Sequence, residues 1–171
     1  AEIDDAVSSF RKENGNQLIL LHCTSSYPTP PEDINLKRIP TLANVFGCIS
    51  GFSDHSEGIV AGVGAVVLGA SFIEKHFTLD QSLPGPDHRF SSNPDEFKQL
   101  VQGIRMIETA IGSSQIRPTE SELVSRNDFR LSCRVTTDLK AGTQLQKENL
   151  SYRRPGTGIS PKLASAIVGL R

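Results

Sequence analysis

The feature that most constrains the fold is an alternation of short apolar runs with helical patterns. Three runs, QLILLHCTS (17–25), CISGFSDH (48–55) and ASFIEKHFT (70–78), are too short for buried helices, and each ends in polar residues. Uninterrupted apolar runs of this length are typical of strands that are buried on both faces of a parallel sheet. Parallel strands need crossover connections, so we expect an α/β fold built from strand–helix units.

Helical periodicity occupies the chain before and between these runs. Apolar residues recur at helical spacing over 3–10 and again over 39–46, where Gly47 is expected to end the helix. Ser56 is expected to cap a third helix over 57–68. That helix is rich in glycine, which would let it lie closely on the sheet.

Two stretches between the periodic segments are predicted to be loops. One is the proline-rich segment 27–31, and the other is the long segment 79–92. After the second loop, Asn93 is expected to cap a helix that continues to Gly112 and carries apolar residues on one face.

The character of the chain changes after residue 112. Residues 113–127 are polar and nonperiodic, which indicates a linker between the α/β part (1–112) and a second domain (128–171). The second domain contains two strand-like pieces, LSCRV and LSYRR, with turn residues between them and a helix start at Ser160. We expect a small, mostly β unit.

Composition excludes several classes of protein. The net charge is −1, with 18 basic and 19 acidic residues that are not clustered, so we expect no nucleic-acid partner. No apolar stretch approaches the roughly 20 residues that span a bilayer, so we expect no membrane partner and a cytoplasmic location. Three cysteines without a CxxC pair argue against both a disulfide framework and a ribbon-type zinc site.

The polar ends of the runs are the candidate site, because ligands bind at the carboxyl ends of parallel strands. Strand alternation places Ser53 and His55 on one side of their strand, and Glu74 and His76 on one side of the next. If both sides face a barrel interior, the two imidazoles converge. They would suit a catalytic divalent metal such as manganese or iron, acting as a Lewis acid. Alternatively, each histidine only forms hydrogen bonds within the interior.

The residues beside the two histidines have two interpretations each. Asp54 can orient His55 or cap the following helix, and Ser53 can donate to an anion at the amino terminus of that helix. Glu74 can be a third metal ligand or a general acid/base, or it can be a buried carboxylate paired with Lys75 or a neighbour.

Two loop residues complete the candidate site. Asp87, in the tight loop PGPDH, can accept hydrogen bonds from a polyol, or the loop can be a plain turn. Tyr27, on a proline-stiffened loop after the first run, can line a sugar pocket or simply pack against its neighbours.

Four motifs resemble one known family. LLHCTSSYPTPPEDINL, GFSDHSEGI, GASFIEKHFTLDQSLPGPDHRFSSNPDEF and RRPGTGISP, in this order, resemble the bacterial sialic acid (N-acetylneuraminate) synthases from about Asn16 onward. The resemblance implies a TIM-type (β/α)8 barrel followed by an antifreeze-like (β-clip, SAF) domain, in a domain-swapped homodimer. This chain would supply the last three βα units and an incomplete antifreeze-like domain. Its first residue is Ala1, within a helical pattern, which also suggests a piece of a longer protein.

The resemblance also implies an activity. Members of the family condense phosphoenolpyruvate with N-acetylmannosamine or a related N-acetylated amino sugar, giving N-acetylneuraminate and phosphate. The reaction would need a divalent metal on His55 and His76, with Mn2+ expected first and Mg2+ or Co2+ as alternatives. The metal would polarise the open-chain aldehyde for attack by C3 of phosphoenolpyruvate, and Glu74 is counted with the histidines as catalytic.

Substrate contacts follow by matching positions. Ser25 and Ser53 resemble contacts to phosphoenolpyruvate, and Tyr27 and Asp87 resemble sugar-binding residues. Arg154 resembles the arginine that the antifreeze-like domain extends into the active site of the partner subunit. Because the strands that would precede this segment are absent, we expect the chain alone to lack synthase activity.

Two alternatives stay open. The acceptor can instead be a precursor of legionaminic acid, pseudaminic acid or a spore-coat sugar. The chain can also be a carbohydrate-binding or scaffold fragment without catalysis.

Overall fold

The computed structural model describes residues 2–171. The chain divides into two compact units, one ending at Ser113 and the other running from Ser114 to Arg171, and each is described by itself. Within the described residues, none of the helices has the length and apolar character needed to cross a bilayer.

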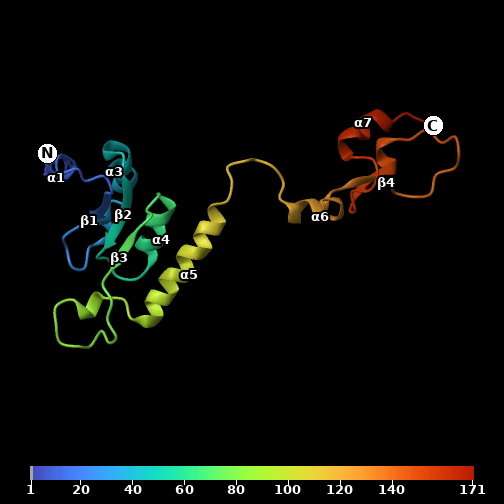
Figure 1. Ribbon diagram of the computed structural model, residues 1–171. Coiled ribbons are helices and arrows are strands. Elements are labelled where there is room, and N and C mark those ends of the chain that lie inside the picture. Colours follow the sequence, from blue (N-terminus) through green and yellow to red (C-terminus); the bar gives the residue numbers. More distant parts are fainter. Residues whose placement is uncertain (1) are drawn as a thin grey trace. The chain divides into compact units, whose positions relative to one another are not determined.

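The first unit is built on a parallel sheet. Its strands are β1 (Ile19–Cys23), β2 (Ile49–Asp54) and β3 (Ile73–Lys75), in the order β1-β2-β3 (Figure 1). The predicted α/β fold is therefore present, although the strands are shorter than their apolar runs. The β2–β3 ladder covers only three residue pairs and ends where Asp54 pairs with Lys75.

Helices connect and cover the strands. They are α1 (Glu2–Lys12), α2 (Pro31–Ile34), α3 (Arg38–Phe46), α4 (Val60–Val67) and α5 (Pro94–Ile111), with a short 3-10 helix η1 (His88–Phe90) before α5. The left-handed backbone of Gly47, at φ 58°, ends α3 as predicted. Asn93 and Glu96 form a reciprocal capping box at the start of α5.

The core of this unit lies between the sheet and the helices α3 and α4. Four buried residues form its centre, and four partly buried ones pack against them: Ile39, Phe52, Ala65 and Ala70, with Ile34, Leu36, Ala61 and Ile73. Since Phe52 and Ile73 point to this side, the alternate residues of β2 and β3 are directed to the opposite face of the sheet.

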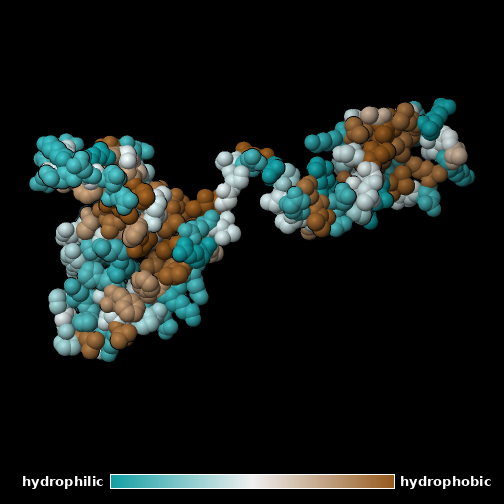
Figure 2. All heavy atoms as spheres, viewed as in Figure 1, coloured by the Kyte–Doolittle hydropathy of each residue, from teal (hydrophilic) through white to brown (hydrophobic). Residues whose placement is uncertain are grey.

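Close packing explains the glycines of α4. A β-carbon at Gly62 would lie 2.9 Å from Leu100 of α5 and 3.5 Å from the Asp54 carboxylate. At Gly103 of α5, a β-carbon would lie 3.1 Å from Val63. The small residues therefore serve the contact between α4 and α5 as well as the contact with the sheet. Hydrophobic residues gather where these two helices meet (Figure 2).

Of three sequence predictions for local structure, two were wrong. The helix α4 begins at Val60 rather than near 57, and Ser56 does not cap it, because its N–H and hydroxyl both donate to Asp54. The predicted loop at 27–31 is present, and its last residue, Pro31, is the first residue of α2, a position that suits proline. The segment 113–127, predicted to be a linker, contains most of α6 (Glu120–Phe129).

The second unit combines this helix with a small antiparallel sheet. Its strands β4 (Ser132–Val135) and β5 (Leu150–Arg153) lie close to the predicted positions. A short 3-10 turn, η2 (Lys147–Asn149), lies between the two strands, and η3 (Pro161–Leu163) and α7 (Ala164–Ile167) follow β5. Ser132 is fully buried, and its hydroxyl donates to the Pro155 carbonyl at 2.8 Å.

Candidate functional site

The two histidines lie together at the carboxyl ends of β2 and β3. The ring centroids of His55 and His76 are 5.2 Å apart, and the planes are inclined by 65°. Both side chains follow the last paired residues of their strands, on the face opposite the hydrophobic core. Strand alternation predicted this convergence, and the ring separation agrees with it.

Hydrogen bonds fix the orientation of the His55 ring. Its Nδ1 lies 3.0 Å from the carbonyl oxygen of Thr24, which can only accept, so Nδ1 carries the proton in the neutral ring. Its Nε2 lies 3.4 Å from the hydroxyl of Ser53. That hydroxyl donates over a shorter distance, 2.6 Å, to Glu74 Oε1. The Nε2 lone pair of His55 is therefore left to accept a proton or a metal ion.

Glu74 is exposed and bound to Ser53, not to Lys75. Glu74 is therefore not the expected buried carboxylate, and the neighbour that it contacts is Ser53. The Ser53 hydroxyl is buried and engaged by Glu74 in this structure, rather than directed at the amino terminus of α4. The pair places an exposed carboxylate beside the two imidazoles.

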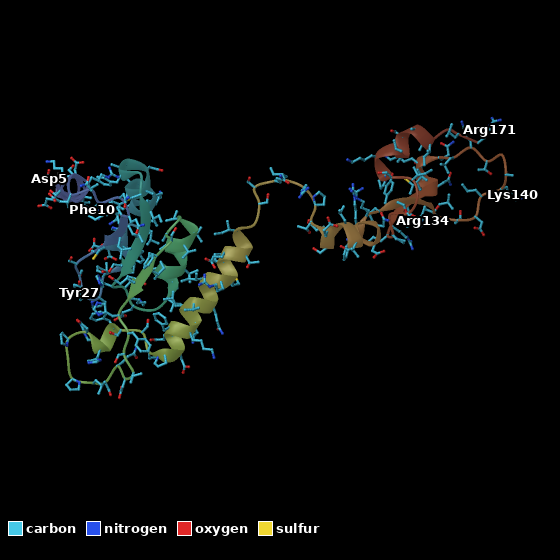
Figure 3. The ribbon with its side chains drawn as sticks, viewed as in Figure 1. Asp5, Phe10, Tyr27, Arg134, Lys140 and Arg171 are labelled. Atoms are coloured by element: carbon cyan, nitrogen blue, oxygen red, sulfur yellow. The ribbon has the colours of Figure 1, made fainter. Side chains whose placement is uncertain are left out.

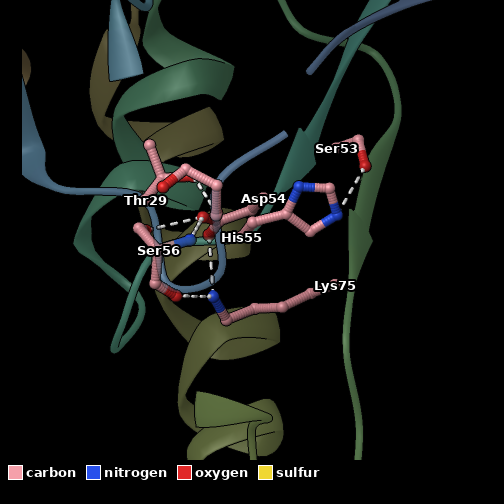
Figure 4. A network of polar contacts seen from close by, with 7 residues as sticks. Thr29, Ser53, Asp54, His55, Ser56 and Lys75 are labelled. Carbon is pink, nitrogen blue, oxygen red and sulfur yellow. Dashed lines mark hydrogen bonds and ion pairs between the residues drawn. The ribbon is translucent and has the colours of Figure 1, made fainter. Parts of the chain in front are cut away.

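The Asp54 carboxylate bonds to Lys75 and Ser56 rather than to the His55 ring, and it does not cap α4, which begins at Val60, so the capping interpretation was wrong. Its Oδ2 accepts from the Lys75 ammonium at 3.0 Å, and its Oδ1 accepts from the N–H and hydroxyl of Ser56 at 2.9 and 2.6 Å (Figure 4). The two charged side chains are 0% and 2% exposed. They form a buried ion pair on the helix-covered face, directly behind the histidines.

Aromatic rings line the other side of the imidazoles. Tyr27, on the loop after β1 (Figure 3), has its ring centroid 4.3 Å from that of His55 and 5.9 Å from that of His76. Phe90 is 5% exposed and lies 5.3 Å from the His76 ring and 5.9 Å from the Tyr27 ring. Phe90 was not predicted from the sequence. The available signal was a single aromatic residue between charged and polar neighbours in a long loop.

The loop that carries Asp87 is held by its own hydrogen bonds. The hydroxyl of Thr78 lies 2.7 Å from Nδ1 of His88, and the Gln81 amide donates to the Ser91 carbonyl at 2.9 Å. The N–H and hydroxyl of Ser82 both donate to the Asp80 carboxylate and hold its pKa below its ordinary value. Specific contacts therefore hold the loop that carries Asp87.

Asp87 and Ser25 are the remaining predicted residues of the first unit. The Asp87 carboxylate is about half exposed, and its Oδ2 lies 3.8 Å from Nδ1 of His76, which is an ion-pair distance only for a protonated ring. Ser25 is exposed on the loop between β1 and Tyr27. Both side chains are accessible to a ligand over the strand ends.

Arg154 belongs to the second unit. Its guanidinium carbon lies 5.3 Å from the centroid of the Phe129 ring, at the end of α6, which is a cation–π contact. The residue is exposed at the end of β5.

The donor set at the strand ends fits part of a divalent metal site. Two imidazoles from adjacent strands provide nitrogen ligands for a transition metal, and the proton on His55 Nδ1 presents Nε2 as the ligand atom. In residues 2–171, no group of three or more His, Cys, Asp or Glu side chains is arranged to hold a metal ion. Glu74 therefore does not join the histidines as a third ligand in this structure.

Comparison with known proteins identifies the family. The family model for the NeuB family matches residues 1–116, which include the whole α/β unit. This chain belongs to the NeuB family. The match covers the strand ends with His55 and His76.

Curated relatives match nearly the whole chain. The N,N'-diacetyllegionaminic acid synthase of Legionella pneumophila is 48% identical over 99% of this chain, and the pseudaminic acid synthase of Campylobacter jejuni is 42% identical over 94%. The matches cover 49% and 46% of those proteins, so the chain spans about half the length of the relatives it resembles.

Solved structures agree with the fold. The spore coat polysaccharide biosynthesis protein SpsE of Bacillus subtilis aligns over 99% of this chain and 52% of its own, with a TM-score of 0.62 and 38% identity. The N-acetylneuraminic acid synthetase of Leptospira borgpetersenii, in complex with citrate, aligns over 73% of this chain and 44% of its own, with a TM-score of 0.64 and 42% identity. The chain therefore has the α/β fold of NeuB-type synthases.

Proposed function

We propose that this chain supplies part of the active site of a synthase that condenses phosphoenolpyruvate with an N-acetylated amino sugar, with addition of water at C2 of phosphoenolpyruvate and release of phosphate. With N-acetylmannosamine as acceptor, the product is N-acetylneuraminate. The observation that carries the proposal is the pair of imidazoles, His55 and His76, at adjacent strand ends, with Nε2 of His55 left open. Membership of the NeuB family supports the same chemistry.

The two histidines are proposed to hold a divalent cation, with Mn2+ preferred over Mg2+ or Co2+. When bound, such an ion supplies Lewis acidity toward a carbonyl oxygen. Neutral imidazoles suit a transition metal, and the Thr24 carbonyl fixes the proton of His55 on the nitrogen that faces away from the site. Two protein ligands leave coordination positions for substrate, water or other residues.

The other residues are proposed to bind and orient the substrates. Glu74 is an exposed carboxylate beside the histidines, placed to exchange a proton with a sugar oxygen as general acid/base. Tyr27 and Asp87 offer an aromatic face and a carboxylate to a polyol. Ser25 and Ser53 are proposed contacts to phosphoenolpyruvate, for which the Ser53 hydroxyl would exchange its bond to Glu74 for one to the substrate.

The assembly of the full-length protein is proposed from the resemblance to the family. The first unit would form the last three βα units of a (β/α)8 barrel, and the second unit would be part of an antifreeze-like domain. In a domain-swapped homodimer, Arg154 would extend into the active site of the partner subunit, where a guanidinium suits an anionic substrate. A cytoplasmic location is part of the same proposal.

A precursor of legionaminic acid, pseudaminic acid or a spore-coat sugar is an equally good proposal for the acceptor sugar. The names of the relatives include legionaminic acid and pseudaminic acid synthases and a spore coat protein, which supports these acceptors as well as N-acetylmannosamine.

Phosphate release tests the proposal directly. The full-length protein that contains this sequence should release phosphate from phosphoenolpyruvate when supplied with Mn2+ and one of several 2-acetamido sugars, whereas the 171-residue chain alone should not. Binding of sugar by the full-length protein without any phosphate release would favour the carbohydrate-binding alternative instead. Turnover by the isolated chain would contradict the expectation that it is inactive alone.

A further inference from the structure

The buried ion pair behind the histidines has no part in the chemistry proposed above. Asp54 and Lys75 directly precede His55 and His76 in sequence, and they form the last residue pair of the β2–β3 ladder. Because side chains alternate along a strand, the charges lie on the helix-covered face while the imidazoles lie on the other. The ion pair is thus one residue from each histidine, at the point where backbone pairing stops.

Regular pairing between β2 and β3 ends with Asp54 and Lys75, so it does not hold the two histidines at a set distance. Beyond this residue pair, hydrogen bonds from side chains connect the two segments. The Lys75 ammonium donates to Asp54 Oδ2 at 3.0 Å and to the Ser56 carbonyl at 2.8 Å, so it ties β3 to the chain on both sides of His55 (Figure 4).

The Asp54 carboxylate fixes the turn that follows His55. Its Oδ1 accepts from both the N–H and the hydroxyl of Ser56. Further out, the His55 carbonyl accepts from the N–H of Thr29 at 2.9 Å, and the His76 carbonyl accepts from the N–H of Ser92 at 2.9 Å. Each histidine is therefore held between a loop on one side and the ion pair on the other.

The burial of both charged side chains argues that the ion pair has a role other than stability. Taking two charges out of water costs free energy, and an apolar pair of similar size is often as stable or more stable. The side chains of Asp54 and Lys75 are nevertheless 0% and 2% exposed. The ion pair contributes little net stability, but it links the ends of β2 and β3 next to the two histidines. This combination points to a positioning role.

We propose that the Asp54–Lys75 ion pair sets the spacing of the His55 and His76 rings and thereby the affinity of the site for a divalent cation. The two are positioning residues, since neither faces the site. The spacing follows from the contacts above, whereas the consequence for cation affinity rests on the proposed function.

The test replaces the pair by uncharged groups of similar size in the 171-residue chain. Asp54→Asn with Lys75→Met removes both charges together, so that no buried charge is left unpaired, as it would be in either single variant. The matched control is Arg105→Met with Glu108→Gln, which removes an exposed ion pair of α5 with an N–O distance of 2.8 Å. Circular dichroism and thermal unfolding identify the variants that remain folded.

The first readout needs no metal. In wild type and control, NMR should show nuclear Overhauser contacts between the imidazole protons of His55 and His76, as expected for centroids 5.2 Å apart. The folded Asp54→Asn/Lys75→Met variant should lose or strongly weaken them. Retention of these contacts at wild-type intensity would overturn the proposal. If the double variant does not fold, Asp54→Glu, which keeps both charges but lengthens one partner of the ion pair by a methylene, tests the same spacing.

The second readout is Mn2+ affinity, measured by electron paramagnetic resonance of the free ion. Loss of an outer contact that orients ligands typically lowers metal affinity about 10- to 100-fold, and we expect a decrease of this size in the double variant but not in the control. Unchanged affinity in a folded double variant would refute the positioning role. A wild-type chain that binds no Mn2+ would instead refute the metal site of the proposed function, and the imidazole contacts would still decide the spacing.

Discussion

At the scale of single residues, proton positions around His55 determine what the site can do. The Nδ1–H of His55 donates to the Thr24 carbonyl, and the Ser53 hydroxyl donates to Glu74, so the hydroxyl oxygen beside Nε2 of His55 has its proton directed elsewhere. A nitrogen lone pair and an exposed carboxylate are thus held side by side. The first suits a metal ion, and the second suits proton exchange with substrate.

Replacing Glu74 by Gln separates these two roles. Since Gln keeps the size of the side chain and removes its basicity, we expect kcat of the full-length enzyme to fall by about 10²- to 10⁴-fold, the usual contribution of general acid–base catalysis. Mn2+ affinity should stay at the wild-type value, because the ligands are the imidazoles. Steady-state phosphate release and Mn2+ titration measure the two effects, and Glu13→Gln, at an exposed position of the first unit, is the control. Unchanged kcat would remove Glu74 from the chemistry.

Phe90 is expected to support the site by packing. Its ring is 5% exposed and contacts the rings of His76 and Tyr27, so truncation leaves a cavity beneath both. Phe90→Ala should lower the free energy of unfolding by about 3–5 kcal/mol, as is typical of buried phenylalanines. Phe90→Leu, which retains most of the apolar volume, should cost clearly less. Chemical denaturation measures both values, and equal values for the two variants would show that the ring does not pack as described.

At the scale of elements, reciprocal capping defines where the two later helices begin. Asn93 and Glu96 cap α5, and Thr119 and Glu122 cap α6 in the same way. In α6, the N–H and hydroxyl of Thr119 donate to the Glu122 carboxylate at 2.7 and 2.9 Å. The N–H bond first, and the hydroxyl bond second, hold the pKa of Glu122 below its ordinary value of 4.5.

This lowered pKa gives α6 a pH dependence of definite sign. A carboxyl whose pKa is lower in the folded state stabilises that state fully above its ordinary value, and the contribution is lost as the pH falls through the lower folded value. We expect the protection factor of the Thr119 amide, which is its exchange rate relative to the intrinsic rate at the same pH, to fall on acidification below about pH 4.5, the ordinary value. Glu122→Gln should abolish this dependence, whereas Glu120→Gln, in the same turn, should keep it. Hydrogen exchange followed by NMR distinguishes them, and a pH dependence that survives Glu122→Gln would contradict the assignment.

At the scale of the whole molecule, periodicity was sufficient to predict the α/β alternation and the meeting of His55 with His76. Both depend on local regularities, namely run length and the alternation of side chains along a strand. The same alternation places Asp54 and Lys75 opposite each other, but an aspartate before a helix is usually a cap, so the ion pair was not recognised. In the structure, Asp54 forms the ion pair with Lys75 and does not cap α4.

The remaining misses have similar physical causes. Phe90 lies in a nonperiodic loop, where only tertiary packing shows which side chain turns inward. The helix α6 was read as a linker because of its polar composition, although Thr119 and Glu122 have the spacing of a capping box.

The most direct test of the proposed cation site is a Mn2+ titration of the chain and of its histidine variants, followed by electron paramagnetic resonance. Wild type should bind one ion per chain, and His55→Ala and His76→Ala should each lower the affinity at least about 10-fold, because each removes one of two protein ligands. His88→Gln is the control, since that imidazole is engaged by Thr78 and is not a proposed ligand. Equal affinity in wild type and in both alanine variants, or no binding by wild type, would contradict the claim that these two imidazoles form a cation site.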